Sequence, residues 1–153
     1  MYKQIHEDNY KKCLKIGYLI AAILTFLGGT AIYAFFRDIN NMAIFHFISK
    51  PHFIISLYNP IKNESVLSNM LIFNLPYGLW CLSGLSIIRA IWLQNTKWVI
   101  IYRFIFIVLV MFYVILKLPR LIPGTFDMLD LLFMGFFAFL ESIIFNTFIR
   151  RNL

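Results

Sequence analysis

The sequence predicts an all-α integral membrane protein, a bundle of four transmembrane helices with an interfacial or re-entrant segment after the first. The chain has 153 residues, of which 61% are hydrophobic and 14% charged. A soluble domain is nearer half apolar and a quarter charged. Seventeen phenylalanines against seven carboxylates give more apolar surface than one water-soluble core of this size can bury. We therefore expect residues 1–153 to form a single transmembrane domain.

The first transmembrane helix is expected at about residues 16–36, in the stretch KIGYLIAAILTFLGGTAIYAFF. Its apolar run of about 21 residues is longer than the 7–15 of a signal-peptide core, so we expect an uncleaved helix. Arg37 and Asp38 end it. The following apolar segment, about residues 42–58, is interrupted by Lys50 and Pro51, and each half is too short to span. We expect this segment to lie at the interface or to be re-entrant.

The second helix is expected at about residues 69–93. Pro76 lacks a backbone N–H donor and predicts a kink there, with Gly78 close by. Asn74 lies near enough in sequence to help satisfy the carbonyl group that the proline leaves unpaired.

The third and fourth helices follow two different connections. The polar residues QNTK at 94–97 predict a tight hairpin before a helix at about 98–116. The stretch KLPRLIPGTF, with two prolines and a glycine, predicts a loop before a helix at about 127–149.

The distribution of lysine and arginine predicts the orientation, because cytoplasmic segments carry an excess of both. Four spans place the two termini and the 94–97 hairpin on one side. That side carries eight such residues: Lys3, Lys11, Lys12, Lys15, Arg89, Lys97, Arg150 and Arg151. The other side carries five: Arg37, Lys50, Lys62, Lys117 and Arg120. We therefore expect both termini in the cytoplasm. The net charge of +7 flanks the spans, so the expected partner is the lipid bilayer and not nucleic acid.

Asp127 and Asp130 are three residues apart and share a helix face at the start of the fourth helix. Carboxylates are favourable at a helix N-terminus, so both could serve as capping groups. They could also form a polar mouth at the outer surface with Arg120, Lys117 and Asn69. Such a mouth would bind a lipid head group, a peptide or a metal.

Glu141 lies about 21 Å along the helix from Asp127, at 1.5 Å per residue, within the cytoplasmic half of the membrane. A buried carboxylate there needs a partner. Arg103 and Arg89 occupy the same half, so we expect a buried pair of Glu141 with Arg103. Arg89 either joins this pair or extends its long side chain to the membrane interface. The pair would act as a structural staple or, alternatively, as a proton or ion relay.

The chemistry of an enzyme is not indicated. His46 and His52 are six residues apart with Lys-Pro between them, which is not a metal-ligand spacing, so we expect no metal. The sequence has no Gly-rich phosphate loop, nucleophile elbow or HExxH motif, and we expect no cofactor.

Two stretches resemble the VanZ-like family of small bacterial membrane proteins. NMLIFNLPYG at 69–78 is similar to the family's Asn, Phe, Pro, Gly pattern, and PGTFDMLDLL at 123–132 to its Gly-Arg-x-x-Asp-x-x-Asp region. The resemblance covers about residues 69–141. Gly124 stands where the family commonly has arginine, and Met134 where an asparagine often follows. The resemblance implies a bacterial inner-membrane protein, with some relatives linked to glycopeptide resistance.

The leading interpretation is thus a non-enzymatic, VanZ-like cell-envelope protein that binds a lipid-linked or peptide ligand, or a membrane partner, at its outer mouth. One alternative is a small transporter or channel subunit, as an oligomer, with a buried Glu–Arg relay. A second alternative is a membrane enzyme acting on lipid head groups.

Overall fold

The computed structural model describes residues 2–36, 66–117 and 127–145, and the side chains from residue 9 and, in the second range, from residue 71. These ranges contain four helices and no strand, which confirms the all-α prediction for this part of the chain. The helices are α1 (Tyr2–Phe36), α3 (Val66–Trp92), α4 (Thr96–Ile115) and α5 (Met128–Ile144). The expected interfacial segment at 42–58 lies outside the described residues.

The observed helices differ from the expected ranges mainly at the N-terminus. α1 begins at Tyr2, far before the expected start near residue 16. Residues 2–15 contain no proline or glycine, so the helix continues into the polar segment where the apolar run ends. α3 begins at Val66 and continues through Pro76, which is buried. The kink at Pro76 stays a prediction.

Among the described residues, three helices are long and apolar enough to cross a membrane: Asn9–Phe36 within α1, Leu71–Trp92 within α3, and all of α4. The chain is therefore a multi-pass membrane protein. The 17 described residues of α5 are also largely apolar, and would extend about 25 Å at 1.5 Å per residue.

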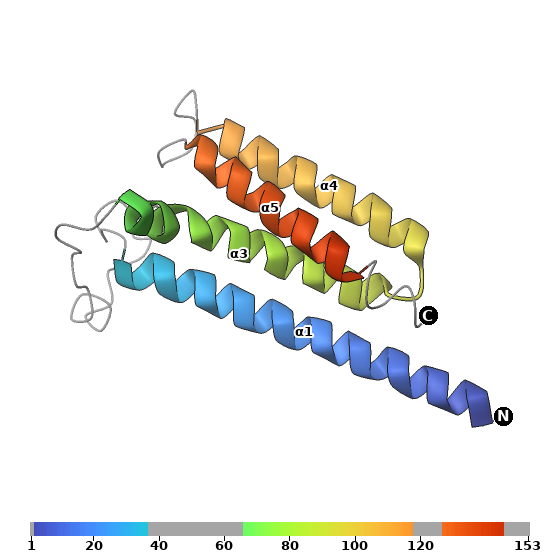
Figure 1. Ribbon diagram of the computed structural model, residues 1–153. Helices are drawn as coiled ribbons and strands as arrows, with labels where there is room; N and C mark the ends of the chain where they lie inside the picture. Colours follow the sequence, from blue (N-terminus) through green and yellow to red (C-terminus); the bar gives the residue numbers. More distant parts are fainter. Residues whose placement is uncertain (1, 37–65, 118–126, 146–153) are drawn as a thin grey trace, which may run out of the picture.

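The helices lie side by side with α3 at the centre (Figure 1). α3 packs against α1, α5 and α4. The core is formed by Tyr77, Cys81 and Leu85 of α3 with Val114 of α4 and Met134 of α5. Val114 is the last residue but one of α4, so this core reaches the end of the bundle where α4 ends.

Three glycines allow the helices to approach closely, because an aromatic ring fills the space that each side chain would occupy. A Cβ at Gly29 of α1 would lie 2.9 Å from Trp80 Nε1 of α3. Gly84 of α3 faces the ring of Phe106 on α4. Gly78 of α3 faces the ring of Phe137 on α5, and a Cβ there would also lie 3.3 Å from the Phe133 carbonyl oxygen. Small residues at such contacts are typical of membrane helix pairs.

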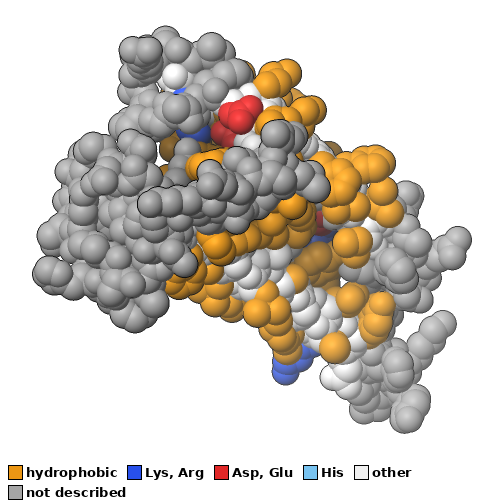
Figure 2. All heavy atoms as spheres, turned by 60° about the vertical axis from the view of Figure 1, so that its left-hand side comes forward, with side chains coloured by type: hydrophobic (Ala, Val, Ile, Leu, Met, Phe, Trp, Pro, Cys, Tyr) orange, Lys and Arg blue, Asp and Glu red, His pale blue; other side chains and the backbone are white. Residues whose placement is uncertain are grey.

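The outward surface of the bundle is apolar. On the face shown in Figure 2, apolar side chains make up most of the described surface. α4 is the clearest case, because Phe104 is 68% exposed while only Val99 and Val114 of this helix are buried. Such surface is suited to contact with lipid tails.

The turn between α3 and α4 is polar and flanked by aromatic rings. Asn95 is the N-cap of α4, and its side chain accepts a hydrogen bond from the Trp98 backbone N–H. The ring of Trp92 stacks on Tyr102 at 5.2 Å between centroids, and Trp98 lies beside both. Tryptophan and tyrosine gather at membrane–water boundaries, so this cluster marks such a boundary.

We expect Gly78→Ala to reduce stability by about 1–3 kcal/mol, because the added methyl group overpacks the contact between α3 and α5. Gly135→Ala on α5 is the matched control, since a Cβ there meets nothing within 4 Å. Thermal unfolding of the two variants in detergent measures the difference. Equal melting temperatures for the two variants would show that the close α3–α5 contact is not required.

Candidate functional site

A buried cluster of ions joins three helices near the end of the bundle that carries the α3–α4 turn, which we call the turn end. Glu141 of α5 lies between two arginines. Its Oε1 is 2.9 Å from Nε of Arg89 on α3, and its Oε2 is 2.7 Å from Nη2 of Arg103 on α4. Glu141 and Arg89 are each only 2% exposed. The structure thus brings Glu141 together with both candidate partners.

Further contacts orient the two guanidinium groups. Nη2 of Arg103 donates a hydrogen bond to Ser142 Oγ at 2.5 Å, and this hydroxyl donates to the Ala138 carbonyl oxygen. The guanidinium carbon of Arg89 lies 3.5 Å from the centre of the Phe145 ring, which is a cation–π contact. Each arginine is therefore held by α5 at two points.

The cluster has more positive than negative charge, since two arginines share one carboxylate. Nη2 of Arg89 and Nε of Arg103 are buried and have no hydrogen-bond partner among the described residues. The phenol of Tyr18 on α1 lies within electrostatic range of all three ions, and its buried hydroxyl is also without a hydrogen-bond partner. All four described helices thus contribute to this region, which keeps unused N–H and O–H donors.

A second charged cluster lies at the opposite end of the bundle, where α4 ends and α5 begins. Nζ of Lys117 donates a hydrogen bond to the Tyr77 hydroxyl at 3.0 Å and lies 3.8 Å from Oδ2 of Asp130. All three side chains are buried. Because a buried charge is unfavourable without a partner, Lys117 and Asp130 stabilise each other there.

Asp127 has a different role from Asp130. It is the N-cap of α5 with an extended backbone, and its Oδ1 accepts a hydrogen bond from the Leu129 N–H at 2.9 Å. Asp127 is half-buried, whereas Asp130 is 3% exposed. Arg120 and the side chain of Asn69 lie outside the described residues. The two aspartates therefore form a cap and an ion pair, and only Asp127 is accessible as a mouth would require.

The two charged clusters are separated by apolar packing. Asp130 and Glu141 are eleven residues apart on α5, about 16 Å at 1.5 Å per residue. Every residue between them on α5 is apolar or glycine, and Met134 is buried against Cys81 and Leu85. The interior between the clusters is thus occupied by the apolar core.

No known protein family, curated protein or solved structure matches this chain. Within residues 2–36, 66–117 and 127–145, no three histidine, cysteine, aspartate or glutamate side chains are grouped to hold a metal ion.

Two features of the charged clusters differ from the expectations. Lys117 was expected in a loop, where it could pair with the aspartates; it does lie 3.8 Å from Asp130, but it is buried in the turn after α4 and also contacts Tyr77. The second feature is the hydrogen bond between Ser142 and Arg103, which forms because Ser142 follows Glu141 directly in α5. A hydroxyl residue directly after a buried carboxylate is the sequence signal that could have predicted this hydrogen bond.

Glu141→Gln is expected to destabilise the bundle by about 3–5 kcal/mol, because it leaves two buried arginines without a carboxylate. Thermal unfolding in detergent measures this loss. The charge-free combination of Glu141→Leu, Arg89→Met and Arg103→Met should recover much of it, since apolar residues of similar volume need no partner. If Glu141→Gln unfolds at the wild-type temperature, the structural role of the Glu141 ion pairs is contradicted.

Two substitutions of Asp127 distinguish the capping role of its side chain from the effect of its charge. Asp127→Ala should lower the free energy of unfolding by about 1 kcal/mol, through loss of the hydrogen bond to the Leu129 N–H. Asp127→Asn should leave it unchanged, because asparagine caps as well as aspartate. The same unfolding assay compares the two, and an asparagine variant as unstable as the alanine variant would rule out the capping role.

Proposed function

We propose that the chain is a non-enzymatic, VanZ-like protein of the bacterial inner membrane, with four spans and both termini in the cytoplasm. Its outer end binds a lipid-linked or peptide ligand, or a membrane partner. In this arrangement the turn end faces the cytoplasm, and the cluster of Lys117, Asp130 and Tyr77 lies at the outer end.

Four spans are supported by the position of α5 beside α3. Its 17 described residues are apolar on the outside, with Phe136 and Phe139 more than half exposed. A helix with such surface would be unstable in water and stable against lipid. An even number of spans then returns the chain to its starting side, which agrees with the excess of lysine and arginine there.

The observation that carries the proposal is the outer charged cluster. Lys117 and Asp130 are 3.8 Å apart, beyond hydrogen-bond length, so their pairing is looser than that of Glu141 with its arginines. Lys117 has three N–H donors, and among the described residues Tyr77 accepts one of them. Lys117 itself is only 3% exposed, so a ligand at this end would first contact the accessible Asp127 carboxylate through its N–H or cationic groups. Lipid-linked and peptide ligands both carry such groups.

The proposed link to glycopeptide susceptibility has a separate and narrower basis. It rests on the resemblance of residues 69–78 and 123–132 to VanZ-like proteins. Asp127 and Asp130 are the positions that carry the second of these motifs.

The transporter alternative has one observation in its favour, which is the meeting of Glu141, Arg89 and Arg103. A relay also needs a polar route, and the core around Cys81, Leu85 and Met134 stands between the two clusters. The alternative of an enzyme acting on lipid head groups needs a nucleophile or metal beside the aspartates. Thr125, the nearest hydroxyl in sequence, lies outside the described residues.

The test uses Asp127→Asn and Asp130→Asn in the bacterial host, with teicoplanin susceptibility measured against the amount of protein in the membrane. Both changes remove one negative charge and keep the side-chain size, and Asp127→Asn also keeps the cap. We expect a severalfold change in teicoplanin susceptibility for the double variant, which carries both Asp127→Asn and Asp130→Asn. Lys97→Gln, an exposed charge at the turn end, is the control and should have no effect.

Unchanged susceptibility of the double variant, with as much protein in the membrane as for the wild type, would overturn the proposed outer binding site. A change seen equally with Lys97→Gln would also count against it, because the effect would then follow the loss of a charge at either end and not the outer end alone.

A further inference from the structure

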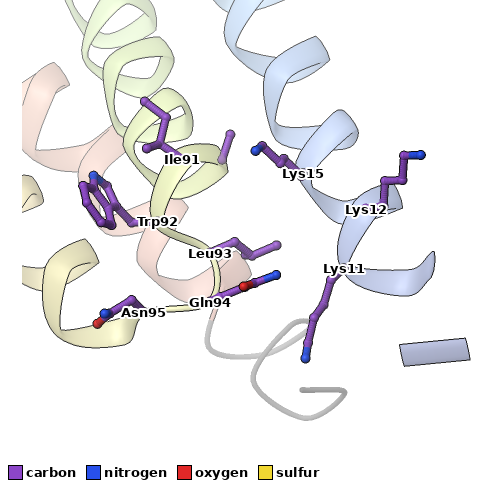
Figure 3. A pocket seen from close by; sticks show the side chains of 9 residues that line it. Lys11, Lys12, Lys15, Ile91, Trp92, Leu93, Gln94 and Asn95 are labelled. Carbon is purple, nitrogen blue, oxygen red and sulfur yellow. The ribbon is translucent and has the colours of Figure 1, made fainter. Parts of the chain in front are cut away.

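A hollow of about 560 Å³ lies at the turn end, between the N-terminal part of α1 and the α3–α4 turn (Figure 3). α1 contributes Lys11, Lys12 and Lys15, while residues 90–95 form the opposite wall. It exists because α1 continues beyond the turn where α3 ends, as Figure 1 shows.

The hollow is strongly basic. Three lysines line it, and none of the other described residues that line it is acidic. Lys12 and Lys15 are exposed, and in Figure 3 Lys15 extends from α1 toward the end of α3. Like charges around a concave surface add to one another, so the positive potential is highest inside the hollow. An anion is therefore the kind of ligand that this charge attracts.

The depth of the hollow corresponds to a membrane–water boundary. Lys15 directly precedes Ile16, where the exposed apolar surface of α1 begins. On the opposite wall, Trp92 belongs to the aromatic cluster with Trp98 and Tyr102. The lysines and this cluster thus lie where the head groups of a bilayer would be.

The opposite wall supplies apolar contacts beside the charge. Ile91 is 60% exposed, and Trp92 and Leu93 lie next to it along the lining. The side chain of Gln94 adds a polar amide at the rim. A ligand that fits both walls has an anionic group and an adjoining apolar part.

We propose that this hollow binds the phosphate of an anionic membrane phospholipid, with Lys15 of α1 on the phosphate, Lys11 and Lys12 adding to the positive potential, and the end of α3 against the first part of the acyl chains. Inorganic phosphate is also an anion, but it has no apolar part that could contact Ile91 and Trp92. The proposal is independent of the outer end, because it uses none of the residues proposed to bind there.

The test measures lipid retention by the full-length chain purified in a neutral detergent, using native mass spectrometry. Phosphatidylglycerol, phosphatidylcholine and inorganic phosphate are added separately. We expect retention of phosphatidylglycerol alone, weakened by added salt. The combined variant Lys11→Gln, Lys12→Gln and Lys15→Gln should bind it on the order of a hundredfold more weakly, at about fivefold per lysine.

Two variants keep the result specific. Lys97→Gln removes a lysine at the same end that does not line the hollow, and it should retain phosphatidylglycerol as the wild type does. Replacement of the three lysines by arginine keeps the charge and should also retain it. Circular dichroism checks that each variant is folded.

The proposal is overturned if the glutamine variant retains phosphatidylglycerol at wild-type strength, or if phosphatidylcholine is retained equally. Displacement of the lipid by an equal concentration of inorganic phosphate would overturn the assignment to a lipid and identify a soluble anion as the ligand.

Discussion

The arrangement of the helices depends on one carboxylate that two arginines share. Glu141 of α5 contacts Arg89 of α3 and Arg103 of α4, so a single side chain fixes three helices relative to one another. A buried ion is tolerated only with its partners in place. Rotating α5 by one residue would move Glu141 by about 100° around the helix and separate it from both arginines. The charge cluster therefore determines which face of α5 points into the bundle.

α4 is joined to the bundle by charged side chains as well as by apolar packing. Only Val99 and Val114 of this helix are buried, and most of its large side chains face outward. Near one end Arg103 contacts Glu141 and Ser142, and just after the other end Lys117 contacts Tyr77. In lipid, apolar side chains gain little by leaving one apolar surface for another, so polar contacts of this kind have the larger influence. α4 also packs on the core through Phe106, Ile107 and Val110, so the polar contacts add to an apolar contact along its middle.

Much of this could be predicted from the sequence, because a membrane restricts what a chain can do. The apolar runs predicted helices, and the isolated Glu141 predicted an arginine partner on a neighbouring helix, since a lone carboxylate cannot remain in an apolar run. The burial of Lys117 could not be predicted, because a lysine directly after an apolar run resembles an ordinary flanking charge. The contact of Gly78 with Phe137 could not be predicted either, as it depends on how α3 and α5 cross. The extension of α1 to Tyr2 was missed because the expected range followed hydropathy alone.

The shared carboxylate has a consequence for how the protein reaches the membrane. A ribosome makes α3 and α4, with their two arginines, before it makes Glu141. An arginine at the centre of a helix makes insertion less favourable by about 2.5–3.5 kcal/mol, and the cost is smaller for Arg89, in the last turn of α3, because it lies nearer the boundary. During that interval the arginines must stay near water or inside the insertion machinery. The last described helix thus supplies the carboxylate that both arginines need, and their cluster can form only once synthesis has passed residue 141.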